Sequence, residues 1–378
     1  MKRLNPCHVR PLLAALVVVM TIALARGAAP ATAPVAVDQH GPTIKEACKD
    51  RFLIGMAGDL PGRYSDREKE LVKENFVIVT PENCMKPAPV HPEEKRWSFE
   101  RPDALVKWCE ENHIAVHGHT LVWHAQTANW FFDGDKAAVI ARMKEHITTL
   151  VGRYKGKVQS WDVVNEAIGD GGNDQAAQTE NLRRSPWLTS VGPEYLTLAF
   201  KFAHEADPQA KLYYNDYGIE AGPKHASSMV LLKRLIKEGA PIHGVGIQGH
   251  WSTRGVPYAA LEKAIADYAS LGLKVSISEL DVTIRGASGG QFGRRRAVEE
   301  TPASAQDLEA QAQAYARLFA IFARHKDVVE RVTFWGLSDR RTWRFGQHPL
   351  IFDSDNQRKP AYVAIVKELM HPNPEPAR

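Results

Sequence analysis

Cysteine is scarce in this 378-residue chain, and no cysteine pair has the spacing of a metal site. Of four cysteines, Cys7 lies among the first residues, which we expect to be cleaved off. The other three, Cys48, Cys84 and Cys109, are an odd number. At most one disulfide can form among them, and the sequence does not select the pair. A chain of this length buries a large core without such cross-links.

Long apolar runs and an excess of one charge are also missing. No later stretch offers the roughly 18 apolar residues of a membrane helix, and the N-terminal run from Leu12 to Ala25 is shorter. This run follows Lys2, Arg3 and Arg10, which is the layout of a secretory signal peptide. Cleavage after Ala25 would remove three positive charges and lower the net charge from +4 to +1. We therefore expect an exported protein without a membrane anchor and without the basic surface that binds nucleic acid.

Eight short apolar, β-branched runs recur along the rest of the chain. They are residues 51–58, 76–83, 115–123, 158–166, 211–218, 244–251, 274–282 and 331–339. Each precedes a stretch with helical spacing, such as Val139, Met143, Ile147 and Leu150. Strand and helix in strict alternation predict parallel strands. Eight units without a glycine-rich phosphate motif favour an α/β fold of the (β/α)8 TIM-barrel type over an open sheet.

Polar and aromatic residues gather at the C-terminal ends of these strands, where barrel enzymes carry their chemistry. Two long connections, 167–190 and 285–303, leave the same face and are candidate walls of a cleft. The second connection carries Arg294, Arg295 and Arg296. These arginines could meet an acidic sugar substituent, but a run of charges is more typical of a solvated loop.

Two glutamates, Glu166 and Glu279, end the fourth and seventh strands. Glycosidic cleavage requires such a pair, one carboxyl to protonate the leaving oxygen and one to attack the sugar or activate water. A single strand-end glutamate is more often an ion-pair partner, so the hypothesis depends on the pair. Strands three apart in an eight-stranded ring allow the roughly 5 Å separation of retaining enzymes. Because strand neighbours point to opposite faces, the chain must curl at Glu166 if Asn165 is also to face the cleft.

Alternation along a strand places Gln248 with His250 and Glu279 with Asp281 on the same side. A histidine that is held by Asp281 and donates to Glu279 would keep the nucleophile ionised and oriented. His250 is our candidate for this histidine. A buried, hydrogen-bonded structural histidine is the alternative.

Sugars present apolar faces edged with hydroxyls, so a glycan cleft needs flat aromatic rings and polar groups. Candidates for the aromatic rings are Trp123, Trp335, Trp343 and Tyr217. Tryptophan is more often a core residue, although Trp343, within the polar segment RRTWRFG, is the hardest of these to bury. Candidates for gripping hydroxyls are Glu82, Asn83 and Lys86, which follow the second strand, and His119, which precedes Trp123 by four residues.

Taken together, these segments resemble the endo-1,4-β-xylanases of glycoside hydrolase family 10. The segments TPENCMK, GHTLVWHAQ, WDVVNEA, LYYNDYG, GIQGHW, ISELDVT, FWGLSD and PLIFDSDNQRKPAY follow the family's order from about residue 50 to 370. Two departures stand out: no aromatic residue directly follows Lys86, and Gly218 replaces the usual asparagine after NDY. They affect the subsites rather than the chemistry.

The resemblance implies a barrel, retention of anomeric configuration, no metal or organic cofactor, and xylan or xylo-oligosaccharides as the substrate. We also expect the protein to be a monomer. By position, Glu166 is the acid/base, Glu279 the nucleophile, Asn165 the partner of the 2-hydroxyl, and His250 with Asp281 the support of the nucleophile. The positions that match the glycone side are Glu82, Asn83, Lys86, His119, Trp123, Gln248, Trp335 and Trp343.

The expected organisation is a signal peptide over residues 1–25, a linker over 26–45 and one catalytic domain over 46–372. Two other functions stay open. One is a retaining barrel glycosidase that acts on cellulose or mannan, since the carboxylate pair does not choose the backbone. The other is a non-catalytic glycan-binding barrel, which would keep the tryptophans and need neither carboxylate.

Overall fold

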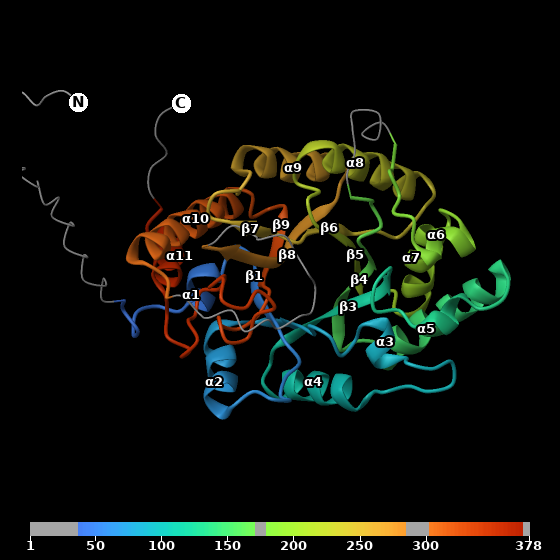
Figure 1. Cartoon of the computed structure of the whole chain (residues 1–378), viewed down its shortest axis with the longest axis horizontal. Helices are drawn as coiled ribbons and strands as arrows, with labels where there is room; N and C mark the ends of the chain where they lie inside the picture. Colours follow the sequence, from blue (N-terminus) through green and yellow to red (C-terminus); the bar gives the residue numbers. More distant parts are fainter. Residues whose placement is uncertain (1–36, 171–178, 285–301, 373–378) are drawn as a thin grey trace, which may run out of the picture. The chain divides into compact units, whose positions relative to one another are not determined.

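Eight parallel strands form a closed barrel in the computed structural model, which describes residues 37–170, 179–284 and 302–372 (Figure 1). In order around the ring they are β1 (Leu53–Ala57), β2 (Ile78–Thr80), β3 (Ala115–Trp123), β4 (Val158–Asn165), β5 (Lys211–Asp216), β6 (Gly244–Ile247), β8 (Lys274–Thr283) and β9 (Val329–Phe334). Strand β9 pairs with β1, and β6 pairs with β8, which closes the ring. The predicted (β/α)8 barrel is confirmed.

Helices surround the strands in Figure 1. They are α1 (Ile44–Cys48), α2 (Asp66–Asn75), α3 (Pro87–Val90), α4 (Glu100–Glu111), η1 (Asn129–Phe132), α5 (Lys136–Arg153), α6 (Pro186–Val191), α7 (Tyr195–Ala206), α8 (Gly222–Lys237), α9 (Tyr258–Ser270), α10 (Ala305–Arg324) and α11 (Pro360–Met370). The helical spacing found in the sequence corresponds to α5, whose Val139, Met143, Ile147 and Leu150 are all buried. Helix α2 begins with a capping box between Ser65 and Glu68.

The sixth predicted strand is interrupted in the structure. Residues 244–251 divide into β6 and a short strand β7 (His250–Ser252), which pairs with β8 at its C-terminal end. The break falls at Gly249, whose φ of +79° lies in the left-handed region that glycine adopts without steric cost. Gln248 and His250 are therefore not placed by strand alternation, and that step of the prediction is wrong.

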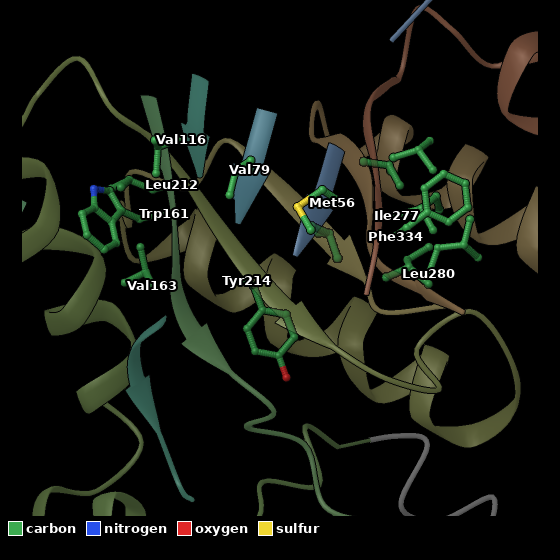
Figure 2. Packing of buried hydrophobic residues seen from close by; sticks show 14 of the residues in the cluster. Met56, Val79, Val116, Trp161, Val163, Leu212, Tyr214, Ile277, Leu280 and Phe334 are labelled. Carbon is green, nitrogen blue, oxygen red and sulfur yellow. The ribbon is translucent and has the colours of Figure 1, made fainter. Parts of the chain in front are cut away.

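Buried side chains fill the spaces around the strands (Figure 2). Trp161 of β4 is fully buried and lies beside Leu212 of β5, its partner in the strand register. The Trp161 ring fits only because residue 118 is glycine. A Cβ at that position would lie 2.1 Å from a ring carbon. Across the view, Phe334 of β9 packs near Ile277 and Leu280 of β8. Each large apolar side chain buried in this way contributes roughly 1.5–3 kcal/mol.

The three cysteines after the N-terminal segment are buried and free. Helix α1 begins at Ile44, so the predicted boundary between linker and domain at residue 45 falls inside a helix. The predicted signal peptide and the run Arg294 to Arg296 lie outside the described residues. Among the helices that are described, none combines the length and apolarity of a membrane span.

Candidate active site

Glu279 lies within strand β8, with only 5 % of its surface exposed. Its Oε1 accepts a hydrogen bond of 2.8 Å from Asn215 Nδ2, on strand β5. Its Oε2 lies 3.2 Å from His250 Nε2. Both carboxylate oxygens are thus held by donors from other strands, β5 and β7, and the predicted contact between His250 and Glu279 is present.

His250 bridges two carboxylates. Its Nδ1 lies 2.9 Å from Asp281 Oδ2, which also accepts a 2.9 Å hydrogen bond from Trp343 Nε1. The other oxygen of Asp281 lies 3.0 Å from Arg344 Nε. Burial acts to lower the pKa of His250, but Asp281 and Glu279 outweigh it and raise the pKa to about 9. His250 is therefore a cation at neutral pH, with an N–H group directed at each carboxylate.

Glu166 lies one residue past the end of β4, with a φ of +58°. Left-handed backbone is uncommon for a residue other than glycine, and it supplies the curl that the sequence requires. Glu166 Oε2 accepts a 2.9 Å hydrogen bond from Trp123 Nε1. Its Oε1 accepts from Gln248 Nε2 at 3.0 Å and from Asn165 Nδ2 at 3.2 Å. All three donors are neutral.

Two amide side chains connect the two glutamates. Asn215 Nδ2 donates to Glu279 Oε1 and, at 2.8 Å, to Asn165 Oδ1, while the amide nitrogen of Asn165 reaches Glu166. Glu166 and Glu279 therefore share one mouth of the barrel. The sequence interpretation missed Asn215, although it lies within the quoted segment LYYNDYG, two residues before Tyr217.

The residues after β2 reach the same region. Lys86 is 7 % exposed, and its Nζ lies 3.3 Å from Asn83 Oδ1 and 5.1 Å from the centroid of the Trp123 ring. Burial lowers the pKa of Lys86, and the charges of Glu279 and Glu82 oppose this shift. Burial also raises the pKa of Glu82. A positive and a negative side chain, Lys86 and Glu82, thus interact electrostatically with the nucleophile Glu279.

The tryptophans expose less than expected. Trp123 and Trp335 are 8 % and 7 % exposed, so they offer little open ring face. Trp335 packs against His119, with ring centroids 5.2 Å apart, and His119 Nδ1 lies 2.9 Å from Asp162 Oδ2. Trp343 is more exposed than these two tryptophans, in line with the polar segment around it.

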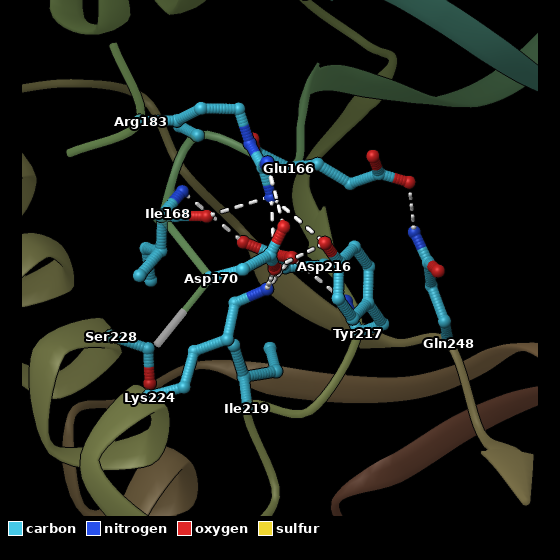
Figure 3. A network of polar contacts seen from close by, with 12 residues as sticks. Glu166, Ile168, Asp170, Arg183, Asp216, Tyr217, Ile219, Lys224, Ser228 and Gln248 are labelled. Atoms are coloured by element: carbon cyan, nitrogen blue, oxygen red, sulfur yellow. Dashed lines mark hydrogen bonds and ion pairs between the residues drawn. The ribbon is translucent and has the colours of Figure 1, made fainter. Parts of the chain in front are cut away.

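Tyr217 belongs to a polar network that reaches the backbone of Glu166 through Arg183 (Figure 3). Its hydroxyl contacts Asp170 and accepts a 2.9 Å hydrogen bond from Arg183 Nη2. Lys224 Nζ lies 3.5 Å from the Tyr217 ring centroid and 2.8 Å from Asp216 Oδ1. Burial raises the pKa of Asp216 to about 6, although Lys224 opposes the shift. No sequence pattern pointed to Arg183, which reaches the site from a long connection.

These contacts define a class of enzyme. A carboxylate beside a fixed cation suits attack on an anomeric carbon, and a carboxyl among neutral donors suits proton transfer to the leaving oxygen. A barrel that holds both at the C-terminal ends of its strands is built as a glycoside hydrolase. Residues 43–368 match Glycosyl hydrolase family 10, and the chain belongs to that family.

Similar proteins cover nearly the whole barrel. The chain is 41% identical over 333 residues to a beta-1,4-xylanase of Dictyoglomus thermophilum. The alignment covers 86% of this chain and 91% of that protein. It is 40% identical over 354 residues to endo-1,4-beta-xylanase A of Thermotoga maritima, covering 89% of this chain but only 32% of that longer protein.

Solved structures agree with these relatives. Xylanase B from Clostridium stercorarium F9 is 34% identical with a TM-score of 0.78, over 86% of this chain and 99% of that one. A mutant of an intracellular xylanase from Thermoanaerobacterium saccharolyticum, solved in complex with xylotriose, is 34% identical with a TM-score of 0.76, over 87% of this chain and 100% of that one.

Proposed function

We propose that this chain is a retaining endo-1,4-β-xylanase, which hydrolyses internal β-1,4 links of xylan. The observation that carries the proposal is the pair Glu279 and Glu166, joined through Asn215 and Asn165 at one mouth of the barrel. The xylanases among the similar proteins, one of them bound to xylotriose, support xylan as the substrate.

The reaction takes two steps. A carboxylate oxygen of Glu279 attacks the anomeric carbon while Glu166 gives its proton to the departing glycosidic oxygen, and a covalent xylosyl-enzyme forms. Glu166, now ionised, takes a proton from water, which attacks the same carbon and releases Glu279. Two inversions give net retention. His250, with its positive charge 3.2 Å from Glu279, stabilises the carboxylate before attack and after its release.

The remaining residues hold the sugar. Asn165 lies between Glu166 and Asn215, where it can bind the 2-hydroxyl of the reacting xylose. Hydrogen bonds to that hydroxyl strengthen in the transition state of such reactions. We assign the glycone hydroxyls to Lys86 and His119, both of which are buried.

Three measurements test the proposal. Proton NMR of the first products from xylotetraose should show the β-anomer, and an α-anomer would contradict Glu279 as the nucleophile. Rates on xylan, carboxymethylcellulose and glucomannan should be highest on xylan, and a higher rate on either of the others would overturn the substrate. Release of reducing sugar from xylan separates an enzyme from a glycan-binding protein.

We also propose that the enzyme is exported and acts as a monomer. The support for export is the positively charged start and the apolar run that ends at Ala25. Edman sequencing of the secreted protein should begin at Arg26, and light scattering should give the mass of a single chain. An uncleaved N-terminus in the exported protein would contradict the predicted cleavage site.

A further inference from the structure

Arg183 binds three carbonyl oxygens in residues 166–168, the turn that carries the acid/base. Arg183 Nε donates to the Glu166 carbonyl oxygen at 3.1 Å, and Arg183 Nη2 donates to the Ile168 carbonyl oxygen at 3.1 Å. The backbone N–H of Arg183 donates to the Ala167 carbonyl oxygen at 2.7 Å. Three successive carbonyls, beginning at Glu166, therefore have the same partner. Figure 3 shows Arg183 with Glu166 and Ile168.

The amides of this turn are held from the barrel instead. The Glu166 N–H donates to the Asn215 carbonyl oxygen at 2.8 Å, the next amide to the Tyr214 hydroxyl at 3.2 Å, and the third to Asp216 Oδ2 at 3.3 Å. All three acceptors belong to β5. The amide side of the turn is thus fixed by a strand of the core, whereas the carbonyl side depends on one residue from outside the barrel.

Arg183 is itself held in place. Its guanidinium forms a two-pronged pair with Asp170, at 2.9 and 3.2 Å, and donates to the Tyr217 hydroxyl at 2.9 Å. The Arg183 side chain is 18% exposed. A guanidinium stays charged at any working pH and presents its donors in a fixed fork, so this arrangement does not vary as Glu166 gains and loses its proton.

We infer that Arg183 is a positioning residue, which fixes the orientation of the Glu166 carboxyl and so controls proton delivery to the leaving oxygen. The inference rests on the proposed function. A φ of +58° is unfavourable for glutamate, and it persists because both sides of the turn are bound. Without the carbonyl contacts, Glu166 relaxes toward ordinary backbone, and its carboxyl moves away from Trp123 and Gln248. Glu279 is unaffected, since it lies within β8.

The test compares two leaving groups. Arg183→Met should lower kcat/KM for phenyl β-xylobioside, whose leaving oxygen needs a proton, on the order of 10²-fold. For 2,4-dinitrophenyl β-xylobioside, whose leaving group departs without a proton, kcat/KM should change less than about 3-fold, because it reports only the step that forms the xylosyl-enzyme. Arg183→Lys, which keeps the charge but loses the fork, should restore only part of the activity on the phenyl substrate.

A matched control is Arg153→Met. Arg153 also forms a two-pronged pair with an aspartate, Asp103, and also contacts an aromatic ring, that of Phe99 at 4.2 Å. It lies on α5, and in the described part of the chain its side chain contacts Asp103 and Phe99 rather than the site, so both substrates should react as in the unaltered enzyme. Asp170→Asn serves as the second variant, because it weakens the hold on Arg183 and keeps all three carbonyl donors.

Each outcome of these kinetic comparisons either supports or overturns the positioning role of Arg183. Equal losses on both xylobiosides, or no loss on either, overturn the positioning role. If Arg183→Met does not fold, as judged by circular dichroism, Asp170→Asn decides, and it should show the same preference for the dinitrophenyl substrate at a smaller size. If the unaltered enzyme cleaves neither substrate, or inverts the configuration, the proposed function itself fails and the inference fails with it.

Discussion

The two catalytic glutamates lie in contrasting surroundings. Glu279 is part of an extended strand, whereas Glu166 follows its strand in a left-handed turn with a φ of +58°. The neighbour of Glu279 is a cation, His250, whose pKa is raised to about 9 although burial acts to lower it. The hydrogen-bond donors on Glu166 are the neutral groups of Trp123, Gln248 and Asn165.

This contrast follows from what each group does in the reaction. Glu279 must be negative whenever it is free, so a permanent positive charge beside it helps at every stage. Glu166 must give a proton in one step and take one in the next, and a fixed cation would oppose its protonated form. The structure holds both carboxylates by side-chain hydrogen bonds, and it places the cation His250 beside Glu279.

The largest expected effect separates the two glutamates by leaving group. Glu279→Ala should lower kcat on the order of 10⁴-fold or more for every substrate, because no covalent intermediate can form. Glu166→Ala should be similarly damaging on xylan yet keep most of its kcat/KM on 2,4-dinitrophenyl β-xylobioside, where no proton is needed. Steady-state kinetics on both substrates checks this. If Glu166→Ala lowered kcat/KM equally on both substrates, the distinction between the roles of Glu166 and Glu279 would fail.

A smaller effect is expected from His250→Asn. Loss of a hydrogen bond to a charged group costs roughly 1.5–3 kcal/mol, so kcat/KM should fall on the order of 10- to 100-fold. The fall should be the same for phenyl and dinitrophenyl leaving groups, since His250 acts on the nucleophile. His225→Asn is the control, because His225 also pairs with an aspartate, Asp267 at 2.8 Å, but lies on α8 away from both glutamates. A larger loss for one of the two leaving groups would contradict the assignment of His250 to the nucleophile.

The same cation makes stability depend on pH. The pKa of His250 is about 9 in the folded chain and about 6.5 when unfolded, so the folded state binds this proton more tightly. Its contribution is fully present below pH 6.5 and is lost as the pH rises through 9. The Tm difference between the unaltered enzyme and His250→Asn should therefore shrink from pH 6 to pH 10. A difference that stays constant over this range would show that the charge of His250 does not stabilise the fold.

Much of this architecture could be predicted from the sequence. The eight strands and the two glutamates follow from alternation and from residue types that have a chemical use at strand ends, and the contact of His250 with Asp281 follows from residue type alone. The curl at Glu166 could also be predicted, because Asn165 and Glu166 are adjacent and both had to reach the cleft. Local pattern is enough where a residue acts from the strand that contains it.

The remainder depends on contacts that no local pattern encodes. The break at Gly249 was missed because one glycine in an apolar run is compatible with a strand until its φ is known. Arg183 and Arg344 come from connections, and their partners belong to other segments of the chain. The low exposure of Trp123 and Trp335 depends on packing across the barrel mouth, which residue type alone does not determine.

The finest test of the comparison removes one N–H from each side. Trp343→Phe loses the donor to Asp281, and Trp123→Phe loses the donor to Glu166, while both keep an aromatic ring. Each change should lower kcat/KM by about 10-fold or less. For Trp343→Phe the loss should be equal for phenyl and dinitrophenyl xylobiosides, because Asp281 supports the nucleophile through His250. For Trp123→Phe the loss should appear only with the phenyl leaving group, and identical profiles for the two variants would mean that the two sides do not act separately.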